Sequence, residues 1–241
     1  MIFLTYIPLL LLTLLLWVLV RRHAYRTYPC FFSYAVFAVL AGVARFVVRD
    51  YPHPYYITYY ATEAGYDVLG VLVMYEVLRA VLGNLIHGRW GRCIFPAILL
   101  ASILLSVARS HAAPTQFTRR VAFYILVGEI AVRFAQVFIF AGLVTLVPLL
   151  GLRWRQYPFG VATGFGLYAT VSLLTTTAFS DFGTRFTFLW GVTSLVAYSL
   201  TVIIWIWFFS APQKSGIPTP EVSALSPGDL KKYKDALRRM R

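Results

Sequence analysis

The sequence predicts an all-α integral membrane protein, a bundle of seven transmembrane helices with its N-terminus outside and its C-terminus in the cytoplasm. Hydrophobic residues fill 59% of the 241 positions and charged residues only 13%, whereas a soluble domain carries about 25% charged residues. Seven apolar stretches are long enough to span a membrane, which takes roughly 20 residues. Basic residues also collect behind alternate stretches, as they do in cytoplasmic loops.

Short connections join the seven stretches, so we expect neighbouring helices to pack antiparallel in one bundle. We expect the first to be a retained helix, because no basic residues precede it and no small-residue cleavage pattern follows it. The fourth is the shortest, and the fifth is the longest. The sixth carries Gly160 and Gly164, whose spacing lets two helices approach closely inside the bundle. The predicted spans are 2–20, 29–48, 55–82, 93–108, 121–150, 158–179 and 187–209.

The basic residues give the bundle its predicted orientation. A net charge of +13 would favour nucleic-acid binding in a soluble protein, but cytoplasmic loops account for it here, so we expect no nucleic-acid partner. The connection 109–120, with three arginines on the outer side, is the exception. Arginine outnumbers lysine strongly, which favours a GC-rich bacterial source and the bacterial inner membrane. The basic residues of the predicted cytoplasmic loops are Arg21, Arg22, Arg26, Arg89, Arg92, Arg153 and Arg155.

The chain divides into a transmembrane domain, residues 1–210, a proline-containing linker, 211–225, and a basic tail helix, 226–241. Ser226 and Pro227 suit the N-cap and the first turn of this helix. Its apolar stripe and basic faces are typical of a helix that lies on an anionic membrane surface. Docking of a cytoplasmic protein is the alternative. The predicted membrane-surface residues are Lys231, Lys232, Lys234, Arg238, Arg239 and Arg241.

Two acids of the third span, Glu63 and Asp67, share a face because they are four residues apart. A charged side chain near the centre of a membrane helix costs roughly 2.5–3.5 kcal/mol, and ionisable groups within a membrane generally mark functional sites. Without a basic partner, one of two neighbouring acids tends to bind a proton. Three tyrosines lie on the same side, one or two turns outward: Tyr56, Tyr59 and Tyr60.

The fifth span carries Glu129, Arg133 and Gln136 on one stripe. Two interpretations are open: Glu129 and Arg133 neutralise each other within the helix, or Arg133 faces the bundle interior and meets Glu63 or Asp67. Arg45 in the second span lies at a similar height. We therefore expect a hydrated, outward-facing ligand cavity among the second, third and fifth spans.

Other polar positions have a plainer interpretation. Glu76 and Arg79, near the inner end of the third span, are expected to pair with each other or to reach the membrane surface. Two hydroxyl and aromatic stripes in the last two spans either complete the cavity or bond to their own helices and pack in the core. These stripes are Tyr168, Ser172, Thr175 and Thr176, and Ser194, Tyr198, Thr201 and Trp205.

Several chemistries lack their residues, and we expect no cofactor, metal or catalytic group. All four lysines lie at position 214 or later, so no lysine in the seventh span can hold retinal. All four histidines fall in predicted loops, which leaves no pair to ligate a haem inside the membrane. The sequence contains neither an H-E-x-x-H zinc motif nor a G-x-S-x-G nucleophile elbow.

Two segments carry a family resemblance: the Glu63 and Asp67 region leading into Tyr75-Glu76-Val77-Leu78-Arg79, and the tail from Ser226 to Arg241. Over its whole length the chain resembles uncharacterised bacterial seven-helix inner-membrane proteins. It is also similar to the seven-helix input modules of some bacterial sensor kinases, which implies no particular activity.

The first functional hypothesis is therefore a membrane-embedded module that senses a small ligand from the outer side or binds a cytoplasmic or membrane protein partner. Its basis is the polar and aromatic outer face above a basic cytoplasmic tail. A small transporter or proton-coupled carrier is the alternative, because the two acids lie near the middle of the membrane. A structural subunit of a membrane complex is the second alternative, and a membrane enzyme is the least favoured.

Overall fold

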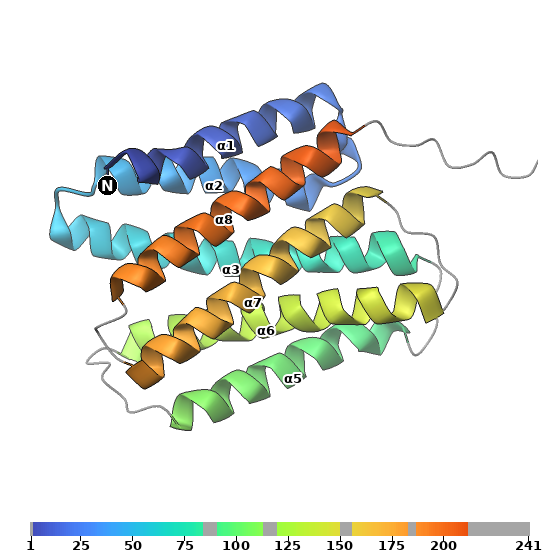
Figure 1. Ribbon diagram of the computed structural model, residues 1–241. Helices are drawn as coiled ribbons and strands as arrows, with labels where there is room; N and C mark the ends of the chain where they lie inside the picture. Colours follow the sequence, from blue (N-terminus) through green and yellow to red (C-terminus); the bar gives the residue numbers. More distant parts are fainter. Residues whose placement is uncertain (1, 84–90, 113–119, 150–155, 183–186, 212–241) are drawn as a thin grey trace, which may run out of the picture. The chain divides into compact units, whose positions relative to one another are not determined.

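The computed structural model describes residues 2–83, 91–112, 120–149, 156–182 and 187–211, and within these ranges the chain is all helical (Figure 1). Seven α-helices and one 3-10 helix make up the described part, and no strand occurs in it. Helix α3 lies in the middle of the group. The elements are α1 (Ile2–Arg21), η1 (Ala24–Arg26), α2 (Pro29–Val47), α3 (Pro52–Leu82), α5 (Gly91–Ala112), α6 (Arg120–Leu149), α7 (Gln156–Phe182) and α8 (Thr187–Ser210).

The all-α prediction is confirmed, and each predicted span contains one helix. Two predicted lengths are wrong. Helix α5 has 22 residues, and the shortest α-helix among the described residues is α2, with 19. The apolar pattern ends at Ala108, but the helix continues through polar residues to Ala112, because hydropathy marks the end of the apolar run only. Helix α3, with 31 residues, is one residue longer than α6, because Pro52 starts its first turn.

Four helical segments of the described chain are long and apolar enough to cross a membrane, which indicates an integral membrane protein. Two more apolar segments, Ile7–Arg21 and Cys93–Ala108, are shorter than this length. Helix α3 is long enough but carries Glu63, Asp67 and Glu76 within its span. The four segments are Pro29–Val47, Val127–Leu149, Gln156–Thr177 and Gly191–Ser210.

Helices that follow each other in the chain run in opposite directions (Figure 1). Helix α3 packs against α2, α6 and α7, while α8 packs against α1 and α7. Two hydrogen bonds join the helix ends at one end of the bundle: Arg22 Nη2 donates to the Ser210 carbonyl at 2.7 Å, and Gln156 Nε2 donates to the Phe208 carbonyl at 3.2 Å. The end of α1, the start of α7 and the end of α8 therefore lie together, as an up-and-down bundle requires.

An aromatic core joins α2, α7 and α8. Phe31 and Phe209 stack with ring centroids 5.4 Å apart, and Trp205 lies edge-on to Phe31 at 5.1 Å. Phe165 of α7 meets the same tryptophan at 4.9 Å. Because all four side chains are almost fully buried, this cluster holds the three helices in one register.

Glycines allow α7 to approach α8 closely. A Cβ atom at Gly160 would lie 2.4 Å from the Phe208 ring, and one at Gly164 would lie 2.2 Å from Trp205 Nε1. Two hydrogen bonds cross the same contact: Thr201 Oγ1 donates to the Gly164 carbonyl at 3.2 Å, and Trp205 Nε1 donates to a carbonyl of α7 at 3.4 Å. The two glycines thus serve packing inside the bundle.

The start of α2 is capped from another helix, because the first N–H groups of a helix have no acceptor of their own. Cys30 N–H donates to Glu76 Oε1 at 3.1 Å, and Phe31 N–H donates to Glu76 Oε2 at 3.0 Å. The expected pair of Glu76 with Arg79 is wrong, because the helix N-terminus offers this carboxylate two donors and favourable dipole charge.

Replacing Glu76 by alanine is expected to destabilise the protein by about 1–2 kcal/mol, because both N–H groups lose their acceptor. Glu76→Gln keeps one carbonyl oxygen and should lose less. Thermal unfolding in detergent measures both variants, with Asp50→Ala as the control, because Asp50 is exposed. An unchanged Tm for Glu76→Ala would show that this cap contributes nothing.

The chain separates into two compact units, Met1–Ser210 and Ala211–Arg241. All of the second unit except Ala211 lies outside the described residues. The predicted linker, the tail helix and its six membrane-surface residues therefore stay predictions.

Candidate functional site

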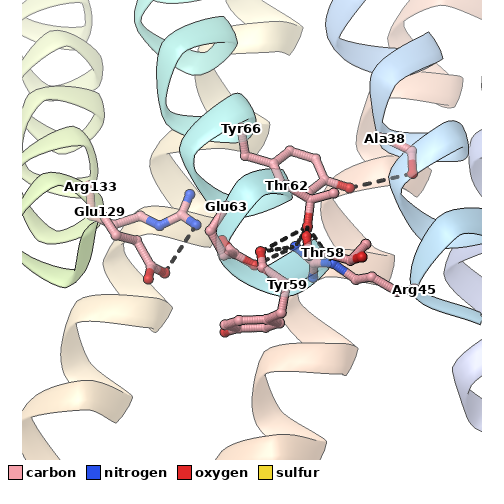
Figure 2. Close-up of polar contacts among 9 residues, drawn as sticks. All are labelled: Ala38, Arg45, Thr58, Tyr59, Thr62, Glu63, Tyr66, Glu129 and Arg133. Atoms are coloured by element: carbon pink, nitrogen blue, oxygen red, sulfur yellow. Dashed lines mark hydrogen bonds and ion pairs between the residues drawn. The ribbon is translucent and has the colours of Figure 1, made fainter. Parts of the chain in front are cut away.

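Arg45 of α2 and Glu63 of α3 form an ion pair inside the bundle (Figure 2). The distance from Arg45 Nη2 to Glu63 Oε1 is 2.9 Å, and 23% and 13% of the two side chains are exposed. Arg45 lies in the last turn of α2, and Glu63 lies in the fourth turn of α3. Because the two helices are antiparallel neighbours, these positions meet.

Arg45 makes further hydrogen bonds through Nε and Nη2. Arg45 Nε donates to Thr62 Oγ1 at 2.7 Å, and Nη2 donates to the same hydroxyl and, at 3.4 Å, to the Tyr59 carbonyl. The guanidinium carbon lies 4.8 Å from the ring centroid of Tyr59 and 5.6 Å from that of Tyr66. Tyr66 in turn donates from its hydroxyl to the Ala38 carbonyl at 3.4 Å. Together, these contacts join α2 to α3.

Arg133 of α6 is the centre of a second polar group. Its Nη2 atom lies 3.5 Å from Glu129 Oε1, one turn earlier on the same helix. Its Nη1 atom donates to Gln136 Oε1 at 3.4 Å, and its guanidinium carbon lies 4.5 Å from the Tyr168 ring centroid. The pairing within the helix is therefore the arrangement found, and Glu63 takes Arg45 as its partner instead of Arg133.

Two nitrogen atoms in this second group are buried without a hydrogen-bond partner: Arg133 Nε and Gln136 Nε2. Only 8% of Arg133 and 1% of Gln136 are exposed. The amide nitrogen of Gln136 is directed at α3, where it lies 3.3 Å from the position that a Cβ atom on Gly70 would occupy. Each buried donor left unpaired costs about 1–3 kcal/mol, so this part of the site is incomplete.

Asp67 of α3 lies between the two groups and is half-buried. It forms no ion pair with any described residue. Its Oδ2 atom lies 3.7 Å from the position of a Cβ atom on Gly128 of α6, so it faces that helix where a side chain is lacking. Arg133 attracts Asp67 electrostatically, while Glu129 and Glu63 repel it. Asp67 is therefore the carboxylate of the cluster that forms an ion pair with neither Arg45 nor Arg133.

The three tyrosines predicted for the site form a row of ring contacts, in which Tyr60 lies between Tyr56 and Tyr59. Tyr59 contacts the charged Arg45. Tyr56 is exposed, and its ring packs on Tyr60 with the centroids 4.6 Å apart. The structure thus brings together Arg45, Tyr59, Glu63, Asp67, Glu129, Arg133 and Gln136, and leaves Tyr56 and Tyr60 toward the start of α3.

The residues of the hydroxyl stripes of α7 and α8 make two different kinds of contact. Thr175 and Thr176 donate to carbonyls of their own helix at 2.8 Å, as the core-packing interpretation expects. Tyr168 contacts Arg133, and its ring lies 5.6 Å from that of Tyr198. Only these two tyrosines of the stripes extend the polar group.

Sequence reasoning missed Thr62, Tyr66 and Tyr34. Tyr66 lies three residues after Glu63, so helical spacing alone would have found it. Tyr34 is buried between the rings of Tyr66, at 5.7 Å, and Phe165, at 5.0 Å. Nothing in the apolar second span singles Tyr34 out.

No protein-family model matches the chain, and neither a curated protein nor a solved structure matches it. Within the ranges described above, no three His, Cys, Asp or Glu side chains gather closely enough to hold a metal ion. The site must therefore be interpreted from its own geometry, as a group of charged and amide side chains shared by α2, α3, α6 and α7.

Proposed function

We propose that all seven α-helices span the inner membrane of a bacterium, with the N-terminus outside and the C-terminus in the cytoplasm. Their antiparallel order supports this topology (Figure 1). Arg21 ends α1, and Arg22 and Arg26 follow it, at the end of the bundle where α8 finishes, as cytoplasmic basic residues would. In this orientation, Glu63, Asp67 and Glu129 belong to the outer half of the bundle.

We propose further that the protein is a membrane-embedded ligand-sensing or partner-binding module and that its ligand binds beside Arg133. One observation carries this proposal: two almost fully buried nitrogen donors, Arg133 Nε and Gln136 Nε2, have no hydrogen-bond partner. They belong to the same polar cluster as Asp67, which forms no ion pair with any described residue. In a membrane interior such groups are costly and are retained where they serve function. A bound ligand supplies the missing partners.

The two halves of the polar cluster have different roles in this proposal. Arg45 Nε and Nη2 are matched to Glu63, Thr62 and the Tyr59 carbonyl, so this half fixes α2 to α3. The half around Arg133 keeps unpaired donors and is the half that recognises the ligand.

A proton-coupled or cation-coupled carrier is the second candidate, and Asp67 favours it. This carboxylate lies near the middle of α3 and lacks an ion-pair partner among the described residues. A carrier moves its solute across a sealed vesicle, whereas a sensor binds the solute without moving it. Uptake into proteoliposomes of any compound found to bind separates the two functions.

A screen for binding tests the ligand site directly. Purified protein is heated with a library of small polar metabolites, and a true ligand should raise Tm by about 3–6 °C at ten times its Kd. Gln136→Met should weaken this response, because it deletes the unpaired amide donor. Thr145→Val, at an exposed position on the same helix, should keep it in full. A ligand response that is unchanged in Gln136→Met would exclude this site.

A further inference from the structure

The charges of the cluster do not balance. Glu63, Asp67 and Glu129 supply three carboxylates, whereas Arg45 and Arg133 supply two guanidinium groups. Glu129 also interacts electrostatically with Glu63 and Arg45, so the two ion pairs form one electrostatic group (Figure 2). With all three carboxylates ionised, one negative charge is left over in a setting of low polarity, where it is strongly disfavoured until a proton or a cation neutralises it.

The surplus charge belongs to Asp67. Glu63 and Glu129 each have an arginine nitrogen within 3.5 Å, whereas Asp67 pairs with no arginine of the described part of the chain. The groups around it are known from every helix of the cluster: Glu63 on α3, Glu129 and Arg133 on α6, Arg45 on α2 and Tyr168 on α7. Among these neighbours, the only cation that attracts Asp67 is Arg133, and Arg133 is already paired.

The unpaired donors add a second requirement. Gln136 Nε2 points at Gly70, which follows Asp67 by three residues on the same face of α3. Asp67 and Gly70, the position that Gln136 Nε2 approaches, are thus three residues apart, or roughly 5 Å along α3. A ligand that satisfies both requirements has a positive charge that pairs with Asp67 and an oxygen that accepts a hydrogen bond from Gln136 Nε2 or Arg133 Nε.

We propose that the site binds a small organic monocation, an amine that carries a hydroxyl or carbonyl oxygen two or three atoms from its nitrogen. Asp67 is its counter-ion, and Gln136 Nε2 and Arg133 Nε donate hydrogen bonds to its oxygen. This inference rests on the proposed ligand-binding function and names the chemical class of the ligand. It excludes anions, although the site contains two arginines.

Four probes of similar size separate the requirements: ethanolamine has both groups, ethylamine the cation only, ethanol the hydroxyl only, and acetate a negative charge. Each is added to detergent-solubilised protein at equal ionic strength, and Tm is measured. Ethanolamine should raise Tm most, by about 3–6 °C at ten times its Kd. Ethylamine should raise it less, while ethanol and acetate should leave it unchanged.

Two substitutions test the ion pair with Asp67 and the hydrogen bond from Gln136 separately. Asp67→Asn should remove the response to both amines, and Gln136→Met should reduce the ethanolamine response to that of ethylamine. Asp50→Asn is the matched control, because it removes an exposed carboxylate and should leave all responses intact. An amine response unchanged in Asp67→Asn, a response to acetate alone, or no amine response overturns the inference. If the metabolite screen still finds a neutral or anionic ligand whose response is weakened in Gln136→Met, the proposed function stands and only the ligand class is wrong.

Discussion

Gly164→Leu is expected to prevent the bundle from folding stably. A Cβ atom at this position lies 2.2 Å from Trp205 Nε1 and within 2.9 Å of two ring carbons. Trp205 is fully buried among Phe31, Tyr34 and Phe165, so its ring has nowhere to move. Overpacking of this kind costs typically 1–3 kcal/mol and sometimes more. Separation of α7 from α8 would also break the hydrogen bond from Thr201 to the Gly164 carbonyl.

Yield of monodisperse protein and Tm in detergent measure the effect. Gly164→Leu should give little folded protein, and Gly164→Ala should lower Tm by about 2–12 °C. Gly191→Leu is the matched control, since this helical glycine is exposed and nothing lies within 4 Å of its Cβ position. A Gly164→Leu protein as stable as Gly191→Leu would contradict the close contact of α7 with α8.

Arg133→Met is expected to produce the largest loss of stability among substitutions in the polar cluster. It removes the cation beside Glu129 and Asp67 and leaves their carboxylates to repel each other in a buried setting. Removing one partner of a buried ion pair costs about 3–5 kcal/mol. Partial exposure of Glu129, at 27% of its side chain, places the expected cost near the lower end of this range.

A second substitution separates charge from packing. The double variant Arg133→Met, Glu129→Met should recover part of the lost stability, because neither member of the pair then remains as an isolated charge. Arg49→Met is the control, because its pair with Asp50 is exposed and contributes about 0–1 kcal/mol. Equal Tm values for the single and double variants would show that Arg133 acts by packing on Tyr168 rather than by its charge.

The helices were predictable because burial in lipid leaves a direct trace in the sequence. The helix boundaries follow apolar runs and the prolines that begin α2 and α3. The trace fails where a helix continues beyond the apolar run, as α5 does through polar residues to Ala112. It also does not mark η1, a single 3-10 turn between α1 and α2.

The chemistry of the site was predictable, and its pairings were not. Ionisable residues in apolar spans stand out in a sequence, so Glu63, Asp67 and Arg133 were found. Which carboxylate meets which arginine depends on the relative height and rotation of separate helices, and these are set by packing contacts such as Gly70 against Gln136. The cap of α2 by Glu76 has the same origin, since it joins positions about 45 residues apart.

The two contacts between α2 and α3 limit how this protein can change shape. Glu63 binds α2 in its last turn, and Glu76 binds α2 in its first turn. These two residues are thirteen positions apart on α3, or about 20 Å. Because α2 and α3 are joined at both ends, they cannot slide past one another without breaking both contacts. We therefore expect α2 and α3 to move as one rigid body. The described residues of α3 and α6 share no ion pair. The contact between α3 and α6, where Asp67, Gln136, Gly70 and Gly128 lie, is therefore less constrained than the contact between α2 and α3.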